Sequence, residues 1–151
     1  MKDKTIAEYK ILPDMNLVLQ VYKGPVTLGI IKQVKKEIYQ QLTYKTSFNF
    51  IVDIRDVEVI LTRDDLINYG NFVAEESDPN DRVKVALLSR TPEQLAATMI
   101  VQLNEKGNSI EHKAFNNLKA CLAWVGIPNT KFNTMALEAT LSTMKQEPVK
   151  D

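Results

Sequence analysis

The sequence predicts one α/β domain built on a mixed β-sheet, and three observations support this prediction. The chain has 151 residues, a length that suits a single domain. Apolar residues make up 44% of it and charged residues 25%, which is the balance of a folded chain and not of a disordered one. Strand-like and helix-like segments follow one another in the order ββαβαβαβα, with one further helix at the C-terminus. Strands that alternate with helices need crossover connections, so most of the sheet should be parallel, with the helices packed on it.

An antiparallel hairpin is predicted at the N-terminus. Residues 9–12 and 17–22 are rich in β-favouring side chains, and the turn-forming residues 13–16 separate them. Gly24 and Pro25 are expected to break the second strand. The hairpin adds an antiparallel strand to the parallel ones, and the sheet is therefore predicted to be mixed.

The first helix is predicted to follow Thr27, which can cap it. Its apolar stripe repeats every three or four residues and comprises Leu28, Ile31, Val34, Ile38 and Leu42. The charged side chains that fall off this stripe are Lys32, Lys35, Lys36 and Glu37. We interpret these charges as a solvated face, with a phosphate-binding patch as the alternative.

The third strand and the second helix follow. Residues 47–54 are almost continuously apolar, which is typical of a strand buried on both faces, and Asp53 lies near its end. Thr62 then caps a helix whose first turn holds Asp64 and Asp65, where acids favour the helix dipole. The stripe of this helix comprises Leu66, Tyr69 and Val73. Gly70 lies in mid-helix, and we attribute it to a tight approach to the sheet.

Residues 83–88 and 110–115 are predicted to be the last two strands. Between them, Thr91 and Pro92 give a strong signal for the start of a helix. The stripe of that helix comprises Leu95, Met99 and Leu103. A further helical face follows the last strand and comprises Leu118, Cys121, Leu122 and Val125.

The domain is predicted to span residues 1–128, and residues 129–151 form a C-terminal tail. A short helix in this tail is marked by Leu137, Leu141 and Met144. Asn133 or Thr134 can cap it. The tail is expected to dock either on its own domain or on a second copy of the chain, and we predict a homodimer.

Charge and targeting signals limit the classes of partner. Nineteen basic residues balance nineteen acidic ones, so no nucleic acid and no anionic membrane is expected as the main partner. The N-terminus has no apolar region of a signal peptide, and no apolar run approaches the ~18 residues that span a bilayer. We therefore expect a cytoplasmic protein without an integral membrane segment. The single cysteine, Cys121, cannot form an internal disulfide and is interpreted as a small buried hydrophobe.

The common catalytic motifs are absent from the sequence. It contains no GxGxxG, no GxxxxGK[ST] and no GxSxG. His112 is the only histidine and lies in a predicted strand, so we expect a structural role for it and no metal site. Asp53 has the position of a phosphoacceptor aspartate, but pairing with Arg55 is the alternative that we favour. We expect no cofactor and no enzymatic activity.

Three segments in this order carry a family resemblance. They are FNFIVDIRDVEVILTRDDL (residues 48–66), RVKVALLSRTPEQLAATMIVQL (residues 82–103) and HKAFNNLKACLAWVG (residues 112–126). Together they resemble the SpoIIAA-like group of small bacterial proteins, which is related in fold to STAS domains and grouped with SEC14-type lipid-binding domains. The resemblance covers about residues 7–127 and implies a SpoIIAA-like, STAS-like fold.

The resemblance also implies a phosphorylation site, from which this sequence departs. In anti-sigma-factor antagonists of the family, an Asp-Ser-Ser-Gly-like motif opens the second helix, and its serine is phosphorylated. Leu61-Thr62-Arg63-Asp64 stands in that place here, so Thr62 takes the position of the hydroxyl without the Ser-Ser-Gly signature. The alternative for Thr62 is a plain N-cap.

Two functions are compatible with these observations. The first is a regulatory or protein-interaction module whose partner binds beyond the carboxyl ends of the strands. The residues predicted to form that surface are Asp53, Arg55, Asp56, Thr62, Arg63, Ser89 and Arg90. The second is a protein that binds a small apolar or lipid-like ligand, as the SEC14 side of the resemblance implies. The residues that could line its pocket are Tyr69, Phe72, Met99 and Trp124.

Overall fold

A mixed β-sheet lies at the centre of the computed structural model, which describes residues 4–105 and 109–146. Within these residues the strands are β1 (Ile6–Leu12), β2 (Leu17–Pro25), β3 (Asn49–Glu58), β4 (Val83–Leu88) and β5 (Ile110–Phe115). They lie side by side in chain order. β1 is antiparallel to β2, and every later pair is parallel. The predicted mixed sheet with an N-terminal hairpin is confirmed.

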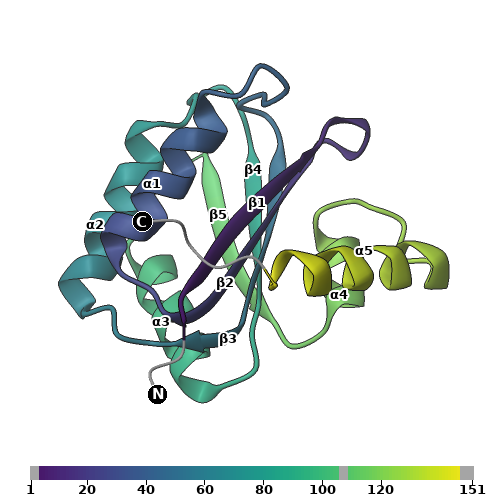
Figure 1. Ribbon diagram of the computed structural model, residues 1–151. Coiled ribbons are helices and arrows are strands. Elements are labelled where there is room, and N and C mark those ends of the chain that lie inside the picture. Colours follow the sequence, from purple (N-terminus) through teal and green to yellow (C-terminus); the bar gives the residue numbers. More distant parts are fainter. Residues whose placement is uncertain (1–3, 106–108, 147–151) are drawn as a thin grey trace.

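Helices cover both faces of the sheet (Figure 1). They are α1 (Leu28–Tyr39), α2 (Arg63–Glu75), α3 (Pro92–Leu103), α4 (Leu118–Trp124) and α5 (Lys131–Met144). The first three lie on one face, and α4 and α5 lie on the other. A short 3-10 turn, Pro13–Met15, joins β1 to β2. The predicted order of elements is confirmed.

Threonine caps begin the three helices of the first face. The hydroxyl oxygen of Thr27 accepts a hydrogen bond from the backbone N–H three residues later, and Thr62 and Thr91 do the same. Thr62 and Thr91 each complete a capping box, because the side chains of Asp65 and Gln94 accept from the backbone N–H of the cap residue. The capping role predicted for these three threonines is confirmed.

Alternation along the inner strands makes two separate cores. Val18, Tyr22 and Phe50 belong to the core under α1, whereas Leu19 and Ile51 belong to the core under α4 and α5. Successive side chains of a strand point to opposite faces, so a strand covered on both sides must be apolar at almost every position. This requirement accounts for the continuous apolar runs of β2 and β3.

β3 is longer than predicted and contains a bulge. The prediction ended this strand at Ile54, but pairing continues to Glu58. Val21 pairs with Asp53 and Lys23 pairs with Asp56, so one residue of β2 faces two residues of β3. After the bulge, β3 continues along the face of the sheet that α1, α2 and α3 cover, and its apolar residue Val57 packs on that face. β2 likewise continues through Pro25, because Gly24 adopts a φ of 77° and keeps its pairing with β3.

The predicted apolar stripe of α1 is wrong at two positions: it includes Leu42, and it leaves out Lys35. The helix ends at Tyr39, so Leu42 lies beyond it and is fully exposed. Lys35, which the periodicity placed on a solvated face, is buried, with 3% of its surface exposed. Its position four residues after Ile31 and three before Ile38 puts it on the inner face of the helix.

The predicted stripe of α3 is the outer face of that helix. The row of Leu95, Met99 and Leu103 is exposed, and the buried side chains are Gln94, Thr98 and Val101. α3 itself carries apolar residues on every side, so their spacing in the sequence does not show which side faces the sheet. The Gln94 amide nitrogen donates to the backbone carbonyls of Arg55 and Val57, which holds this polar side chain inside.

The C-terminal tail docks on its own domain. Leu137 and Leu141 of α5 are buried in the core that also contains α4. Thr130 caps α5, because its hydroxyl oxygen accepts from the backbone N–H of Asn133. The expectation that Asn133 or Thr134 caps this helix is therefore wrong. Residues 147–151 of the tail lie outside the described part of the chain.

No helix in the described part of the chain has the length and apolarity needed to cross a membrane.

Candidate functional site

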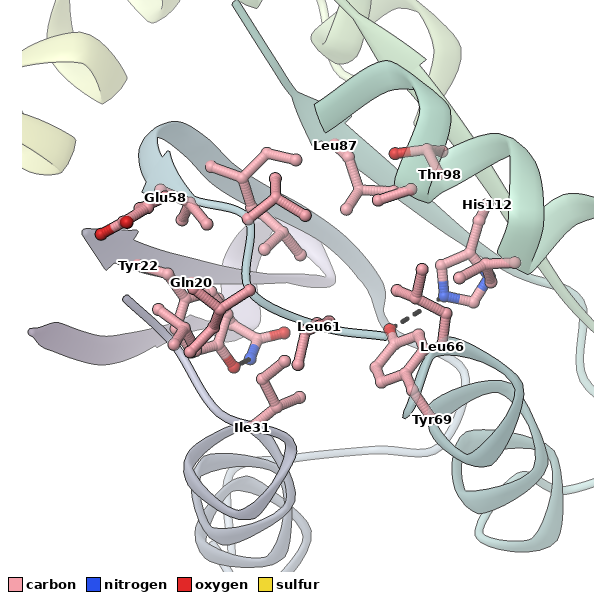
Figure 2. A pocket seen from close by; sticks show the side chains of 18 of the residues that line it. Gln20, Tyr22, Ile31, Glu58, Leu61, Leu66, Tyr69, Leu87, Thr98 and His112 are labelled. Atoms are coloured by element: carbon pink, nitrogen blue, oxygen red, sulfur yellow. Dashed lines mark hydrogen bonds between the residues drawn. The ribbon is translucent and has the colours of Figure 1, made fainter. Parts of the chain in front are cut away.

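An apolar cavity of about 100 Å³ lies between the sheet and helices α1, α2 and α3 (Figure 2). It is found where β2, β3 and β4 reach their carboxyl ends, a position where open α/β sheets commonly bind ligands. Residues 57–61, which read VEVIL, contribute to its wall as the chain passes from β3 to α2. Apolar side chains of α1, α2, α3, β3 and β4, and one from the link between β2 and α1, complete the wall: Val26, Ile31, Val52, Ile54, Leu66, Leu87, Ala97 and Val101.

Gln20 is one of the few polar residues in this mostly apolar wall. Its side chain is fully buried on β2, and its nitrogen donates to the hydroxyl oxygen of Tyr22 at 2.8 Å. The amide oxygen of Gln20 has no hydrogen-bond partner within the described residues. Leaving a buried acceptor unpaired costs about 1–3 kcal/mol, which makes this position unusual for a purely structural core.

A hydrogen-bonded chain runs from the cavity to the protein surface through His112. Nε2 of His112 lies 2.9 Å from the hydroxyl of Tyr69, and Nδ1 lies 2.6 Å from a carboxylate oxygen of Glu105. Burial lowers the pKa of His112, although Glu105 opposes this effect. We therefore assign a neutral ring that donates from Nδ1 to Glu105 and accepts at Nε2 from Tyr69. Figure 2 shows the Tyr69 hydroxyl directed at this ring.

Lys35 is the buried cation of the site. It borders both the main cavity and a smaller one of about 10 Å³. Its Nζ lies 3.9 Å from the centroid of the Phe50 ring. Burial lowers the pKa of Lys35 to about 7. Within the described residues this ammonium group makes no hydrogen bond and no ion pair, so the aromatic ring is its one favourable contact.

Asp53 and Asp56, two of the residues predicted to bind a partner, lie in ion pairs that join the sheet to the C-terminal tail. Both Nε and Nη2 of Arg55 donate to Asp53, which is fully buried, and Nη2 also lies 2.6 Å from Glu138 of α5. Nζ of Lys145, which follows α5, lies 2.9 Å from Asp53 and 3.0 Å from Asp56. Hydrogen bonds from Arg55 and Lys145 lower the pKa of Asp53 against the opposing effect of its burial.

The other predicted site residues are dispersed around the same end of the sheet. Arg90 pairs with Asp56 at 2.9 Å. Ser89 is buried, and its hydroxyl donates to the backbone carbonyl of Phe115. Thr62 and Arg63 are exposed at the start of α2.

The structure does not bring the predicted site residues to the cavity. None of the seven residues predicted to bind a partner lines it. Of the four aromatic and methionine residues predicted to line a pocket, Tyr69 does so. Phe72 packs beside the core of α2 and α3, Met99 is exposed, and Trp124 packs against Phe115 on the opposite face of the sheet.

The sequence analysis predicted Tyr69 as a pocket residue but missed the other polar residues of the cavity, although two of these left a signal. Gln20 interrupts the apolar run LVLQVY of β2, where a polar side chain must be buried. Lys35 shares the helical face of Ile31 and Ile38. His112 was expected to have a structural role in a strand, and the structure shows a buried, hydrogen-bonded ring in β5. The described part of the chain holds no cluster of metal-ligating side chains.

Comparisons with known proteins show the fold of the chain and no activity. No protein-family model and no curated protein matches the sequence. Among solved structures, the chain is similar to an uncharacterised protein of the DUF3478 family with a SpoIIAA-like fold from Shewanella loihica PV-4. The two share 15% sequence identity with a TM-score of 0.58, over 83% of this chain and 98% of the other. The fold of this protein is therefore SpoIIAA-like, as the three sequence segments implied.

Proposed function

We propose that the protein is a non-enzymatic binder of a small apolar ligand, which occupies the cavity between the sheet and helices α1, α2 and α3. The observation that supports this proposal is the cavity itself. Protein cores hold few voids larger than a water molecule. An empty apolar space of about 100 Å³ costs roughly 2 kcal/mol of stability at the usual cost per unit of cavity volume. A ligand that fills the space would offset this cost.

The volume indicates the size of the group that enters. An engineered apolar cavity of about 150 Å³ holds benzene. The cavity described here is somewhat smaller, so it suits a single aromatic ring or a short alkyl chain. A longer ligand would have to extend past residues 57–61 toward the solvent.

Two neighbouring alanines of α3 provide a matched test of this function. Ala97 lines the cavity, whereas Ala96 is exposed on the same helix. Toluene titrated into the wild-type protein should give saturable changes in the amide NMR signals of residues around the cavity. Ala97→Phe fills the space and should abolish these changes, and Ala96→Phe should preserve them. The proposal fails if toluene causes no saturable change in the wild type, or if both variants respond alike.

The exposed row of α3 favours a second candidate, a protein-interaction module of the SpoIIAA or STAS kind. Leu95, Met99 and Leu103 are about half exposed or more, and they lie on one side of the helix. Apolar side chains gathered in this way are typical of interaction surfaces. The partner to test first is a second copy of the chain. Light scattering at high micromolar concentration should give twice the monomer mass for the wild type and the monomer mass for Met99→Glu. A monomer in both samples would contradict pairing through this row.

A further inference from the structure

We infer that the ligand is an apolar carboxylic acid whose carboxylate pairs with Lys35 at the inner end of the cavity, where Tyr69 and His112 also lie. This inference rests on the proposed function and assigns a chemical class to the ligand. The starting observation is a buried ammonium group that contacts an aromatic ring but no anion. Buried charges in proteins are almost always paired, because the cost of removing an ion from water is large.

The other charged groups around Lys35 do not supply that anion. Glu58 borders the main cavity and Glu76 borders the smaller one, but both are exposed and neither is within ion-pair distance of Lys35. In Figure 2 the carboxyl group of Glu58 is turned away from the other labelled side chains. Glu105 is engaged by His112. A negative charge brought by the ligand would therefore complete the site.

The chemistry of the wall distinguishes a carboxylate from other anions. A phosphate group carries up to two charges and is usually bound by several donors, such as arginines or consecutive backbone N–H groups. The cavity has one lysine among mostly apolar walls, and its other polar groups are two tyrosines, a neutral histidine, the Gln20 amide and the Thr98 hydroxyl, with the exposed Glu58 at its border. A single negative charge attached to an apolar body matches this composition.

The pairing should depend on pH in one direction. The ammonium form of Lys35 binds the carboxylate, and burial lowers the pKa of Lys35 to about 7. Affinity for an acid should therefore fall between pH 6.5 and pH 9.

The other titratable groups that line the two cavities are Tyr22, Tyr39, Tyr44, Glu58, Tyr69, Glu76 and His112. Burial raises the pKa of the four tyrosines and lowers that of His112, so none of these five should titrate in this interval.

The test compares acids with their neutral amides of nearly the same shape. Benzoate and benzamide form one pair of probes, and hexanoate and hexanamide form the other. NMR titration of the wild-type protein at pH 6.5 should give at least tenfold tighter binding of each acid than of its amide. The preference should shrink severalfold at pH 9, because only the affinity for the acid depends on a protonated lysine.

Two variants of α1 separate the role of Lys35 from a general effect of charge. Lys35→Met removes the buried ammonium group but keeps an apolar side chain of similar length. It should bind acid and amide within about threefold of each other. Lys36→Met removes the neighbouring exposed charge and should keep the wild-type preference.

The outcomes distinguish this inference from the proposed function on which it rests. If the wild type binds the amides as tightly as the acids at both pH values, the cavity is a binding site but the inference is wrong. If it binds neither acids nor amides, and toluene also fails to bind, the proposed function itself is wrong. An acid preference that survives in Lys35→Met would also overturn the role assigned to Lys35.

Discussion

The ammonium group of Lys35 lies 3.9 Å from the centroid of the Phe50 ring, and 3% of the residue is exposed. A cation–π contact of this kind is worth up to about 2 kcal/mol, less than the cost of burying a charge without a counter-ion. The lowered pKa of Lys35 follows from that difference, because burial penalises the charged form and no anion opposes it.

The lowered pKa of Lys35 predicts how the free energy of unfolding changes with pH. Below pH 7 both the folded and the unfolded chain carry the proton, and the folded state bears the cost of the buried charge. Between pH 7 and 10.5 the folded state loses a proton that the unfolded state keeps, so the free energy of unfolding should rise with pH. Integrated from pH 7 to pH 9, the rise is about 2 kcal/mol, by the usual conversion of a pKa shift.

Urea unfolding of the wild type and Lys35→Met at pH 7 and pH 9 measures this rise. The difference in unfolding free energy between the two proteins should change by about 2 kcal/mol in favour of the wild type at the higher pH. The comparison cancels other titrating groups, including Cys121, whose pKa is raised by burial. Parallel pH profiles for the two proteins would show that Lys35 is not desolvated in the folded state.

At the scale of an element, α2 contains a glycine, Gly70, at a position where a larger side chain would fit. Gly70 was attributed to a tight approach between this helix and the sheet, but a Cβ added there would meet no atom within 4 Å. That explanation is wrong, and nothing in the structure explains the glycine. Gly70→Ala should therefore stabilise the protein by about 0.5–1 kcal/mol, because alanine is the better helix former.

Gly24 gives the matched control for this prediction. It has a φ of 77°, and a Cβ added there would lie 2.9 Å from the backbone oxygen of Lys4. Gly24→Ala should destabilise the protein, because both the conformation and the space exclude a side chain. Thermal unfolding should thus show the midpoint rise for one variant and fall for the other. A fall for Gly70→Ala would mean that α2 packs more closely than the structure shows.

Helices also show where sequence periodicity is sufficient and where it fails. The starts of α1, α2 and α3 could be predicted, because a threonine cap is a local signal that depends on a few neighbouring residues. The inner faces of α1 and α3 could not be predicted fully. Lys35 is buried by the sheet beneath it, and Gln94 is buried by carbonyl groups of β3, which lies more than thirty residues earlier in the chain.

At the scale of the whole molecule, the sheet divides the protein into two sides with different roles. α4 and α5 close one side, where Asp53, Arg55 and Lys145 form ion pairs that join the tail to the end of β3. Four of the seven residues predicted to bind a partner pair among themselves, Arg55 with Asp53 and Arg90 with Asp56. The other side, under α1, α2 and α3, contains the cavity.

The fold could be predicted from the sequence and the candidate site could not, for a physical reason. The order of elements follows from local patterns, and the parallel pairing of most strands follows from the crossover connections that alternating strands and helices require. The cavity depends on small differences in packing among seven elements and the segment after β3. Four of these elements bring polar residues to the cavity: Gln20, Lys35, Tyr69 and His112. The spacing of these residues in the sequence does not show that they lie close together in the fold.

The measurement that most directly tests the account locates toluene on the protein by intermolecular NOEs. The side chains of Thr98 and Val101 face the cavity, and those of Leu95 and Met99 lie on the outer row of the same helix. We expect NOEs from toluene to the methyl groups of Thr98 and Val101 and to the ring of Tyr69. NOEs confined to Leu95 and Met99 would place the probe on the outer surface of α3 and contradict a ligand site inside the fold.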